Sequence, residues 1–207
     1  MAGSAGHVDF WFDLSSPWTY LAFHNIQKLA AETGARIAWR PFLVGGVFNA
    51  VNASVYAGRE DPGSPKMRHM FKSVKDWADW SGLALNFPAP HHPVRSVHAM
   101  RVCCALEADQ PALHRFAEAA FAAYFVDQAN LDEPSVLAGI ADALGMDGAG
   151  LIAKTQDPAV KDHLKANTQA VIDLGGYGSP TIVVDGADMY FGNDQLPLVR
   201  RALERTG

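Results

Sequence analysis

The sequence contains very little cysteine: two residues in 207, the adjacent Cys103 and Cys104. Neighbouring cysteines cannot form a disulfide framework, and they lack the spacing of a metal-binding pair. Long apolar runs are also missing, because no stretch approaches the roughly 18 uncharged apolar residues that a membrane-spanning helix requires. The opening stretch MAGSAGHVDF has neither the basic nor the apolar segment of a secretory leader. We therefore expect a cytoplasmic protein.

The sequence also lacks an excess of positive charge. The 17 lysines and arginines stand against 22 aspartates and glutamates, which gives a formal net charge of -5. Such a balance provides no general attraction to phosphate backbones or to anionic lipids. Neither nucleic acid nor a membrane is therefore expected as a partner. The 49% hydrophobic content is sufficient for one sizeable core.

The N-terminal part of the chain predicts a β–α–β unit. Apolar and polar residues alternate over 8–13, which is typical of a strand. Pro17 suits the first turn of a helix and Gly34 its end, so we expect a helix over 17–33. Residues 35–41 have the composition of a second strand. A connection of this length requires a parallel pair with a right-handed crossover.

The rest of the chain divides into three parts. Residues 42–64 are rich in glycine, asparagine and serine and are expected to form a long loop. Apolar residues then recur at helical spacing over 66–175. Strand character returns at Thr181–Val184 and Met189–Phe191, which predicts a hairpin followed by a last helix from Asp194. The order predicts an α/β fold with a βαβ…ββα core (residues 1–63 and 176–207) that surrounds an all-helical insertion (residues 64–175).

Three short motifs place polar residues at the ends of predicted helices and strands. Ser15-Ser16-Pro17 lies where the first helix begins, and free N–H groups and partial positive charge at that point can hold an anion beside a serine hydroxyl. The alternative is a simple N-cap. Gly178-Ser179-Pro180 precedes a strand, so Pro180 is either an ordinary first residue or part of a cis peptide that exposes the Ser179 backbone. Asn193-Asp194 provides an N-cap for the last helix or, in addition, grips the charged end of a small ligand.

Histidines and cysteines outside these motifs predict no further site. His91, His92 and His98 surround prolines in a loop-like stretch, without a carboxylate or thiolate at a recognised ligand spacing. No metal is therefore expected. Cys103 and Cys104 lie on an apolar helical stretch and are expected to be core residues.

Taken together, the motifs resemble the thioredoxin-fold group that contains bacterial 2-hydroxychromene-2-carboxylate isomerases and kappa-class glutathione transferases. The resemblance extends from Val8 to Leu203 and implies a thioredoxin-like core, glutathione as the cofactor and a homodimer. It rests on six stretches in order: FDLSSPWTYLAF, PFLVGGVFNAVN, PKMRHMFKSVKDWA, DPAVKDHLKANT, GSPTIVVDG and FGNDQL.

The resemblance also implies roles for individual residues. Ser16 would face the glutathione sulfur, and the peptide before Pro180 would be cis, so that the backbone of Ser179 pairs with the tripeptide. Lys66 matches a lysine that meets a glutathione carboxylate, with a solvated surface lysine as the alternative. The remaining implied contacts are Asn52, and Asn193 and Asp194 at the γ-glutamyl end.

More distantly, the group is similar to periplasmic disulfide oxidoreductases with a Cys-Pro-x-Cys pair. Here that position has Ser16-Pro17-Trp18-Thr19, so both sulfurs are absent and thiol–disulfide exchange is excluded. The resemblance implies glutathione-dependent interconversion of 2-hydroxychromene-2-carboxylate and trans-o-hydroxybenzylidenepyruvate in aromatic catabolism. The alternatives are glutathione transfer to small electrophiles and a thioredoxin-fold binding module without chemistry.

Overall fold

The protein is described by a computed structural model that covers residues 6–59, 61 and 63–206. Its sheet has four strands in the order β2-β1-β3-β4, with β1 and β2 parallel and the other neighbouring pairs antiparallel. The predicted β–α–β unit and the predicted hairpin are therefore both confirmed. The strands are β1 (His7–Phe12), β2 (Arg36–Pro41), β3 (Thr181–Val184) and β4 (Asp188–Phe191).

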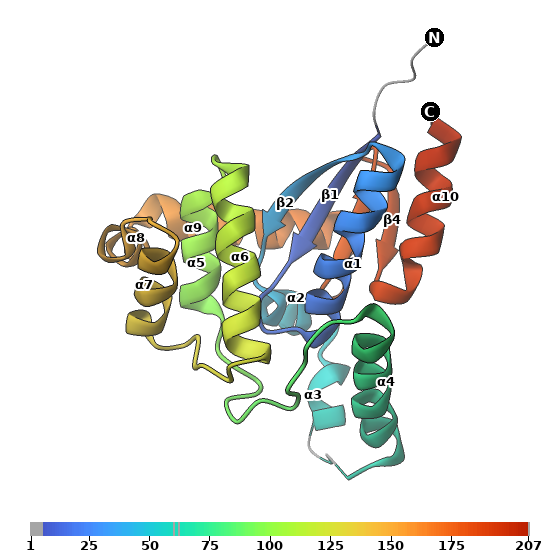
Figure 1. Ribbon diagram of the computed structural model, residues 1–207, viewed down its shortest axis with the longest axis horizontal. Helices are drawn as coiled ribbons and strands as arrows, with labels where there is room; N and C mark the ends of the chain where they lie inside the picture. Colours follow the sequence, from blue (N-terminus) through green and yellow to red (C-terminus); the bar gives the residue numbers. More distant parts are fainter. Residues whose placement is uncertain (1–5, 60, 62, 207) are drawn as a thin grey trace.

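Helix α1 (Pro17–Thr33) connects the two parallel strands as the sequence predicts. It ends at Gly34, whose φ of 73° is a left-handed conformation that glycine adopts without a steric penalty. The last helix begins later than expected, because a 3-10 turn (Asn193–Gln195) comes before α10 (Leu196–Thr206). α10 packs beside α1 (Figure 1).

Five helices gather beside β2, at the opposite edge of the sheet from β4 and α10 (Figure 1). Three of them, α6, α7 and α9, carry a proline in the first turn, as expected. Aromatic contacts join this group to the sheet, because Phe121 of α6 lies against Phe12 of β1 and is stacked on Tyr20 of α1. The five helices are α5 (Val97–Leu106), α6 (Gln110–Phe125), α7 (Pro134–Ala143), α8 (Gly148–Lys154) and α9 (Pro158–Asp173).

The predicted loop over 42–64 is wrong, because most of it is helical. It forms α2 (Val44–Val51) and α3 (Ser54–Arg59). Val44 and Val47 lie on one side of α2 and pack in an apolar cluster with Val171 of α9. One of the glycines that suggested a loop instead allows α2 to approach α9 closely.

Gly46 of α2 lies against α9. A Cβ added there would lie 2.9 Å from the methyl carbon of Thr168 on α9. That methyl group is held in place, because the Thr168 hydroxyl donates to Leu164 O at 2.7 Å and accepts from Leu43 N at 3.0 Å. Rotation about the Thr168 side chain would break both hydrogen bonds.

We therefore expect Gly46→Ala to lower the free energy of unfolding by about 1 kcal/mol, since the clash outweighs the better helix propensity of alanine. Gly45→Ala is the matched control, because a Cβ at Gly45 meets no atom within 4 Å. The control should gain roughly 0.5–1 kcal/mol. Urea unfolding of both variants provides the measurement, and equal stability of the two would contradict a tight α2–α9 contact.

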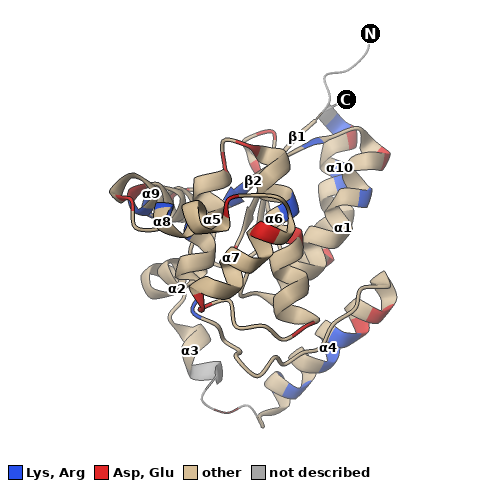
Figure 2. Ribbon diagram, turned by 60° about the vertical axis from the view of Figure 1, so that its left-hand side comes forward, with Lys and Arg blue, Asp and Glu red and all other residues tan. Residues whose placement is uncertain are grey.

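Helix α4 (Pro65–Ser81) and α3 lie beyond the carboxyl end of β1, next to the first turn of α1 (Figure 1). Residues 82–96 then form an irregular segment that leads to α5. Figure 2 shows basic residues along α4, with acidic residues towards its C-terminal end. Among the described helices, none combines the length and the apolar composition needed to cross a bilayer.

Candidate active site

The Ser16 side chain makes two hydrogen bonds at the N-terminus of α1. Its backbone is extended, with φ −98° and ψ 121°, and its Oγ accepts from Thr19 N at 3.2 Å, so Ser16 is an N-cap. The same hydroxyl donates to the backbone carbonyl of Ser179 at 3.1 Å. The two alternatives for Ser16 are therefore compatible, because one oxygen caps the helix while its proton faces the second motif.

The Ser179–Pro180 peptide is cis, as expected, and its carbonyl side lies against the Ser16 hydroxyl. The buried hydroxyl of Ser179 accepts from Asp13 N at 2.9 Å and lies 2.7 Å from the hydroxyl of Thr19. Ser179 is thus attached to the end of β1 and to the first turn of α1. This network fixes the position of the Ser179 carbonyl at the site.

Asp13 is a buried carboxylate directly beneath these motifs. It accepts hydrogen bonds from Ser15 N at 2.9 Å, Ser15 Oγ at 2.8 Å, Val44 N at 2.8 Å and Ser96 Oγ at 3.0 Å. Burial raises the pKa of the Asp13 carboxyl, and the hydrogen bonds from Ser15, Val44 and Ser96 oppose that rise. Asp13 therefore connects β1 to the starts of α2 and α5. The sequence predicts no role for Asp13, since two of its partners, Val44 and Ser96, lie 31 and 83 positions further along the chain.

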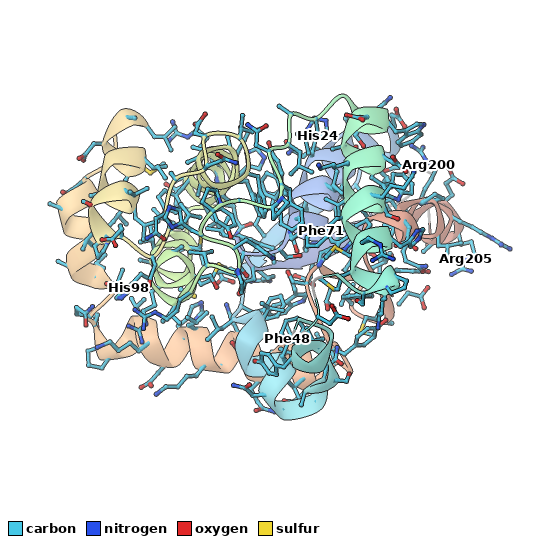
Figure 3. The ribbon with its side chains drawn as sticks, turned by 90° about the horizontal axis from the view of Figure 1, so that it is seen from below. His24, Phe48, Phe71, His98, Arg200 and Arg205 are labelled. Carbon is cyan, nitrogen blue, oxygen red and sulfur yellow. The ribbon has the colours of Figure 1, made fainter. Side chains whose placement is uncertain are left out.

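A cavity of about 750 Å³ opens at the N-terminus of α1. Its volume lies within the range of small-molecule sites, roughly 300–1,000 Å³. Residues of α2, α3, α4 and the irregular segment after α4 form much of its wall. Figure 3 shows two of these side chains, Phe48 from α2 and Phe71 from α4. The large apolar lining residues are Trp18, Phe48, Met67, Met70, Phe71, Phe87 and Phe191.

Four of the residues predicted from the sequence line this cavity: Ser16, Asn52, Lys66 and Ser179. Asn52 donates from Nδ2 to Tyr177 O at 3.0 Å, and its Oδ1 accepts from the hydroxyl of Ser54 at 3.0 Å. Lys66 lies exposed in the first turn of α4. Of the lining residues that the structure describes, Lys66 carries the only permanent charge.

The other three predicted residues lie outside the described lining of the cavity. Pro180 is buried, and Asn193 is 2% exposed with its Oδ1 accepting from Asn25 Nδ2 at 2.8 Å. Asp194 is exposed. The predicted N-cap role of Asn193 or Asp194 is wrong, because Gly192 occupies the capping position and α1 already engages the Asn193 side chain.

The described residues contain one group with metal-ligand geometry. Ligand atoms of Cys104, Glu107 and His163 lie within 4.8 Å of one another. The Glu107 carboxylate is already used, since it pairs with Arg40 at 3.3 Å and with His163 at 2.6 Å. A guanidinium group on the carboxylate opposes a second cation there, so Glu107 is better described as a polar link between Arg40 of β2 and His163 of α9.

Cys103 and Cys104 are buried core residues, as expected, and burial raises the pKa of both thiols, so neither is a reactive thiolate. Of the histidines expected in a loop, His98 instead lies on α5, well to the side of Phe48 and Phe71 (Figure 3). His92 lines the cavity, which no sequence signal predicted.

Comparisons with known proteins agree with this geometry. The model of the DSBA-like thioredoxin domain matches residues 7–204. 2-Hydroxychromene-2-carboxylate isomerase of Sphingobium xenophagum is 30% identical over 202 residues, which cover 95% of this chain and 97% of that protein. Glutathione S-transferase kappa 1 of Homo sapiens is 26% identical over 209 residues, which cover 95% of this chain and 90% of that protein.

A solved structure of 2-hydroxychromene-2-carboxylate isomerase has a TM-score of 0.81 and 25% identity, covering 96% of this chain and 95% of that one. The chain therefore belongs to the DSBA-like thioredoxin domain family, and within it is an enzyme similar to the 2-hydroxychromene-2-carboxylate isomerases and the kappa-class glutathione transferases.

Proposed function

We propose that this protein is a glutathione-dependent isomerase that interconverts 2-hydroxychromene-2-carboxylate and trans-o-hydroxybenzylidenepyruvate in aromatic catabolism. The observation that carries the proposal is the position of Ser16. Its hydroxyl lies at the N-terminus of α1, against the Ser179 carbonyl and on the wall of a largely apolar cavity. This arrangement can stabilise an anionic sulfur beside space for an aromatic substrate.

The polar groups around the cavity fit glutathione. The tripeptide has a thiol, two carboxylates, an amino group and peptide N–H groups. The Ser16 hydroxyl suits the sulfur, the Ser179 carbonyl can accept a peptide N–H, and the Lys66 ammonium can meet a carboxylate. Asn52 adds a side-chain amide at the same wall. For the γ-glutamyl end we propose the exposed carboxylate of Asp194, with Asn193 beneath it as support.

The energetics are adequate without a nearby base. A thiol like that of free cysteine titrates near ~8.5, and a pKa two units lower requires about 2.7 kcal/mol of preferential thiolate stabilisation. The helix N-terminus supplies roughly 0.5–2 kcal/mol. A hydrogen bond from Ser16 to a charged sulfur supplies about 1.5–3 kcal/mol.

Ser16 has a single hydroxyl proton, which Ser179 O accepts in this structure. When the Ser16 hydroxyl rotates away from Ser179 O and towards a bound thiolate, it exchanges a neutral hydrogen bond for a charge-assisted one, which is about twice as strong. The lone pair that accepts from Thr19 N stays where it is. The net thiolate stabilisation from Ser16 is therefore smaller than its gross hydrogen-bond energy. The helix N-terminus supplies much of the rest of the stabilisation that the lower thiol pKa requires.

Bound glutathione would supply the nucleophilic thiolate that adds reversibly to the substrate and permits rotation about its former double bond. The chain's own residues bind and enclose the substrate. Trp18, Phe48 and Phe71 provide apolar surface for an aromatic ring and exclude water. Ser16 holds the sulfur at one position relative to that surface.

Transfer of glutathione to small electrophiles is the alternative, and the similarity to the human kappa-class enzyme over 95% of this chain favours it. Two measurements separate the functions. Calorimetric titration with glutathione should show binding. The absence of binding would contradict both enzymatic functions, and the remaining function would be a binding module for a ligand other than glutathione. Turnover should then be faster with 2-hydroxychromene-2-carboxylate than with a general electrophile, with glutathione recovered unchanged. Consumption of glutathione would instead identify a transferase.

The proposal includes a homodimer in the cytoplasm, where thiols are kept reduced. We expect light scattering at micromolar concentration to give about twice the mass of the 22.3 kDa chain. If the dimer interface is large, dilution of the protein through the nanomolar range should not change its elution volume in gel filtration. A monomer at micromolar concentration would contradict this part of the proposal.

A further inference from the structure

We propose that Asn25 of α1 is a positioning residue for the γ-glutamyl group of glutathione, and that it acts on Asp194 through Asn193. This inference rests on the function proposed above and adds a residue that the sequence analysis did not single out. Asn25 is partly buried and is not among the described residues that line the cavity. Its influence on the ligand therefore passes through the groups that it binds.

The Asn25 side chain joins three elements. Its Nδ2 donates to Asn193 Oδ1 in the 3-10 turn at 2.8 Å, and to Ser81 Oγ at the end of α4 at 2.9 Å. An amide nitrogen carries two hydrogens, so both donors of Asn25 are used. One side chain on α1 thus links this helix to α4 and to the 3-10 turn.

Each of these three elements carries a group that we have proposed for glutathione. Ser16 is the N-cap of α1, Lys66 lies in the first turn of α4, and Asp194 belongs to the 3-10 turn. The tripeptide would contact all three elements at once. Their relative positions therefore determine how well the thiol and the charged ends of glutathione are met.

The position of Asn193 depends on the Asn25 amide. Asn193 is 2% exposed, and in the part of the chain that the structure describes its Nδ2 has no hydrogen-bond partner. The bond from Asn25 to Oδ1 is therefore what holds the polar end of the Asn193 side chain. Without Asn25 both ends of a buried amide would be unpaired, which is costly. We expect the 3-10 turn to shift in that case, so that the Asn193 amide reaches water or another partner.

Asp194 follows Asn193 directly, so it moves with the turn. Its Oδ1 lies close to Gly192, since a Cβ added at Gly192 would be 2.8 Å from that oxygen. Gly192 N donates to Pro180 O at 3.4 Å, and Phe191, the residue before Gly192, lines the cavity. The Asp194 carboxylate is therefore close to the edge of the cavity. A carboxylate there suits the ammonium of the γ-glutamyl group, because a charge-assisted hydrogen bond is stronger than a neutral one.

This role predicts a loss of affinity that depends on the ligand. N-Acetylcysteinylglycine keeps the thiol, the peptide groups and the glycine carboxylate of glutathione but lacks the ammonium and the carboxylate of the γ-glutamyl group. In calorimetric titration, Asn25→Ala should weaken the binding of glutathione by about threefold to tenfold, as the loss of a hydrogen bond does. Binding of N-acetylcysteinylglycine should stay within about twofold of its value in the unsubstituted protein. The pKa of the bound glutathione thiol should stay within about 0.3 units, because Ser16 is unchanged.

Gln27→Ala is the matched control for a lost amide on the same helix. Gln27 Nε2 donates to Phe23 O at 3.0 Å, and Gln27 Oε1 lies 2.9 Å from His114 Nε2. These partners belong to α1 and α6, and neither carries a group that we propose for glutathione. The control should leave the affinity for both ligands within about twofold.

A double substitution separates positioning of Asp194 from a general structural role. If Asn25 acts through Asp194, Asn25→Ala should change glutathione affinity by less than about twofold in an Asp194→Ala background. Additive losses in the double variant would overturn the inference, because Asn25 would then act on another part of the site.

The remaining outcomes distinguish this inference from the proposed function. Unchanged glutathione affinity in Asn25→Ala, or an equal loss for both ligands, would overturn the role of Asn25 and leave the proposed function intact. If Asn25→Ala fails to fold, Ser81→Ala removes one of the two acceptors of Asn25 and should give a smaller loss for glutathione alone. An equal effect of Ser81→Ala on both ligands would again overturn the role. Failure of the unsubstituted protein to bind glutathione would instead contradict the proposed function.

Discussion

Replacing Ser16 with alanine should raise the pKa of enzyme-bound glutathione by roughly one to two units. The reason is the loss of the hydroxyl that can turn from the Ser179 carbonyl to the sulfur. The rate at neutral pH should then fall by about tenfold to a hundredfold and recover partly at high pH, where the thiolate forms without help. Binding should weaken much less, since Ser16 would contact only the sulfur in the proposed complex. Thiolate absorbance titrated against pH in both proteins measures the shift.

A control must separate this effect from the loss of a helix cap. Ser64 is the N-cap of α4, where its hydroxyl accepts from Met67 N at 3.3 Å, and it lies outside the cavity lining. Ser64→Ala should lower stability by about 1 kcal/mol, as Ser16→Ala does through its cap, but leave the thiolate pKa unchanged. Coincident titration curves for Ser16→Ala and the unsubstituted protein would show that Ser16 is only a cap.

Replacing Asp13 with asparagine should lower the free energy of unfolding by roughly 3 kcal/mol or more. Asparagine is close in size, but its NH₂ group would face donors instead of accepting from them. Of the groups that Asp13 binds, Val44 N–H and the Ser96 hydroxyl meet one carboxylate oxygen, and Ser15 meets the other through two donors. One side of this buried network must therefore lose its acceptor.

Urea unfolding at neutral pH provides this measurement, with exposed Asp79→Asn as a control that should stay within about 0.5 kcal/mol. Because Asp13 also attaches the start of α2 to the site, the asparagine variant should bind glutathione more weakly even while folded. Stability within 1 kcal/mol of the unsubstituted protein would show that the Asp13 hydrogen bonds contribute little net energy.

Local patterns were sufficient for the elements near Ser16. Alternation over 8–13, the proline after Ser16 and Gly34 specify a strand, a helix start and a helix end by short-range physics alone. The helices of 42–64 were missed because glycine counts as a loop signal, whereas Gly46 serves a contact with Thr168, far along the chain. That contact is a tertiary effect, which composition does not report.

The site shows the same division between local and long-range information. Ser16 and Ser179 could be located from the motifs, because both stand at element ends. The hydrogen bonds of Asp13 and His92 reach Ser96, which is 83 positions from Asp13, and Tyr124, which is 32 positions from His92. The burial of Asn193 follows from a partner on α1, Asn25, 168 positions away. Partners at such separations are determined by packing, so the sequence alone does not reveal them.

The hydrogen bond between the hydroxyls of Thr19 and Ser179 determines what a substitution at position 19 would do to the site. In a paired-cysteine ancestor or descendant, position 19 would hold the second sulfur, but here its hydroxyl is buried and bonded to Ser179, which in turn accepts from Asp13 N. Cysteine at position 19 alone would remove that bond without creating a redox couple, because the couple also needs a sulfur at position 16.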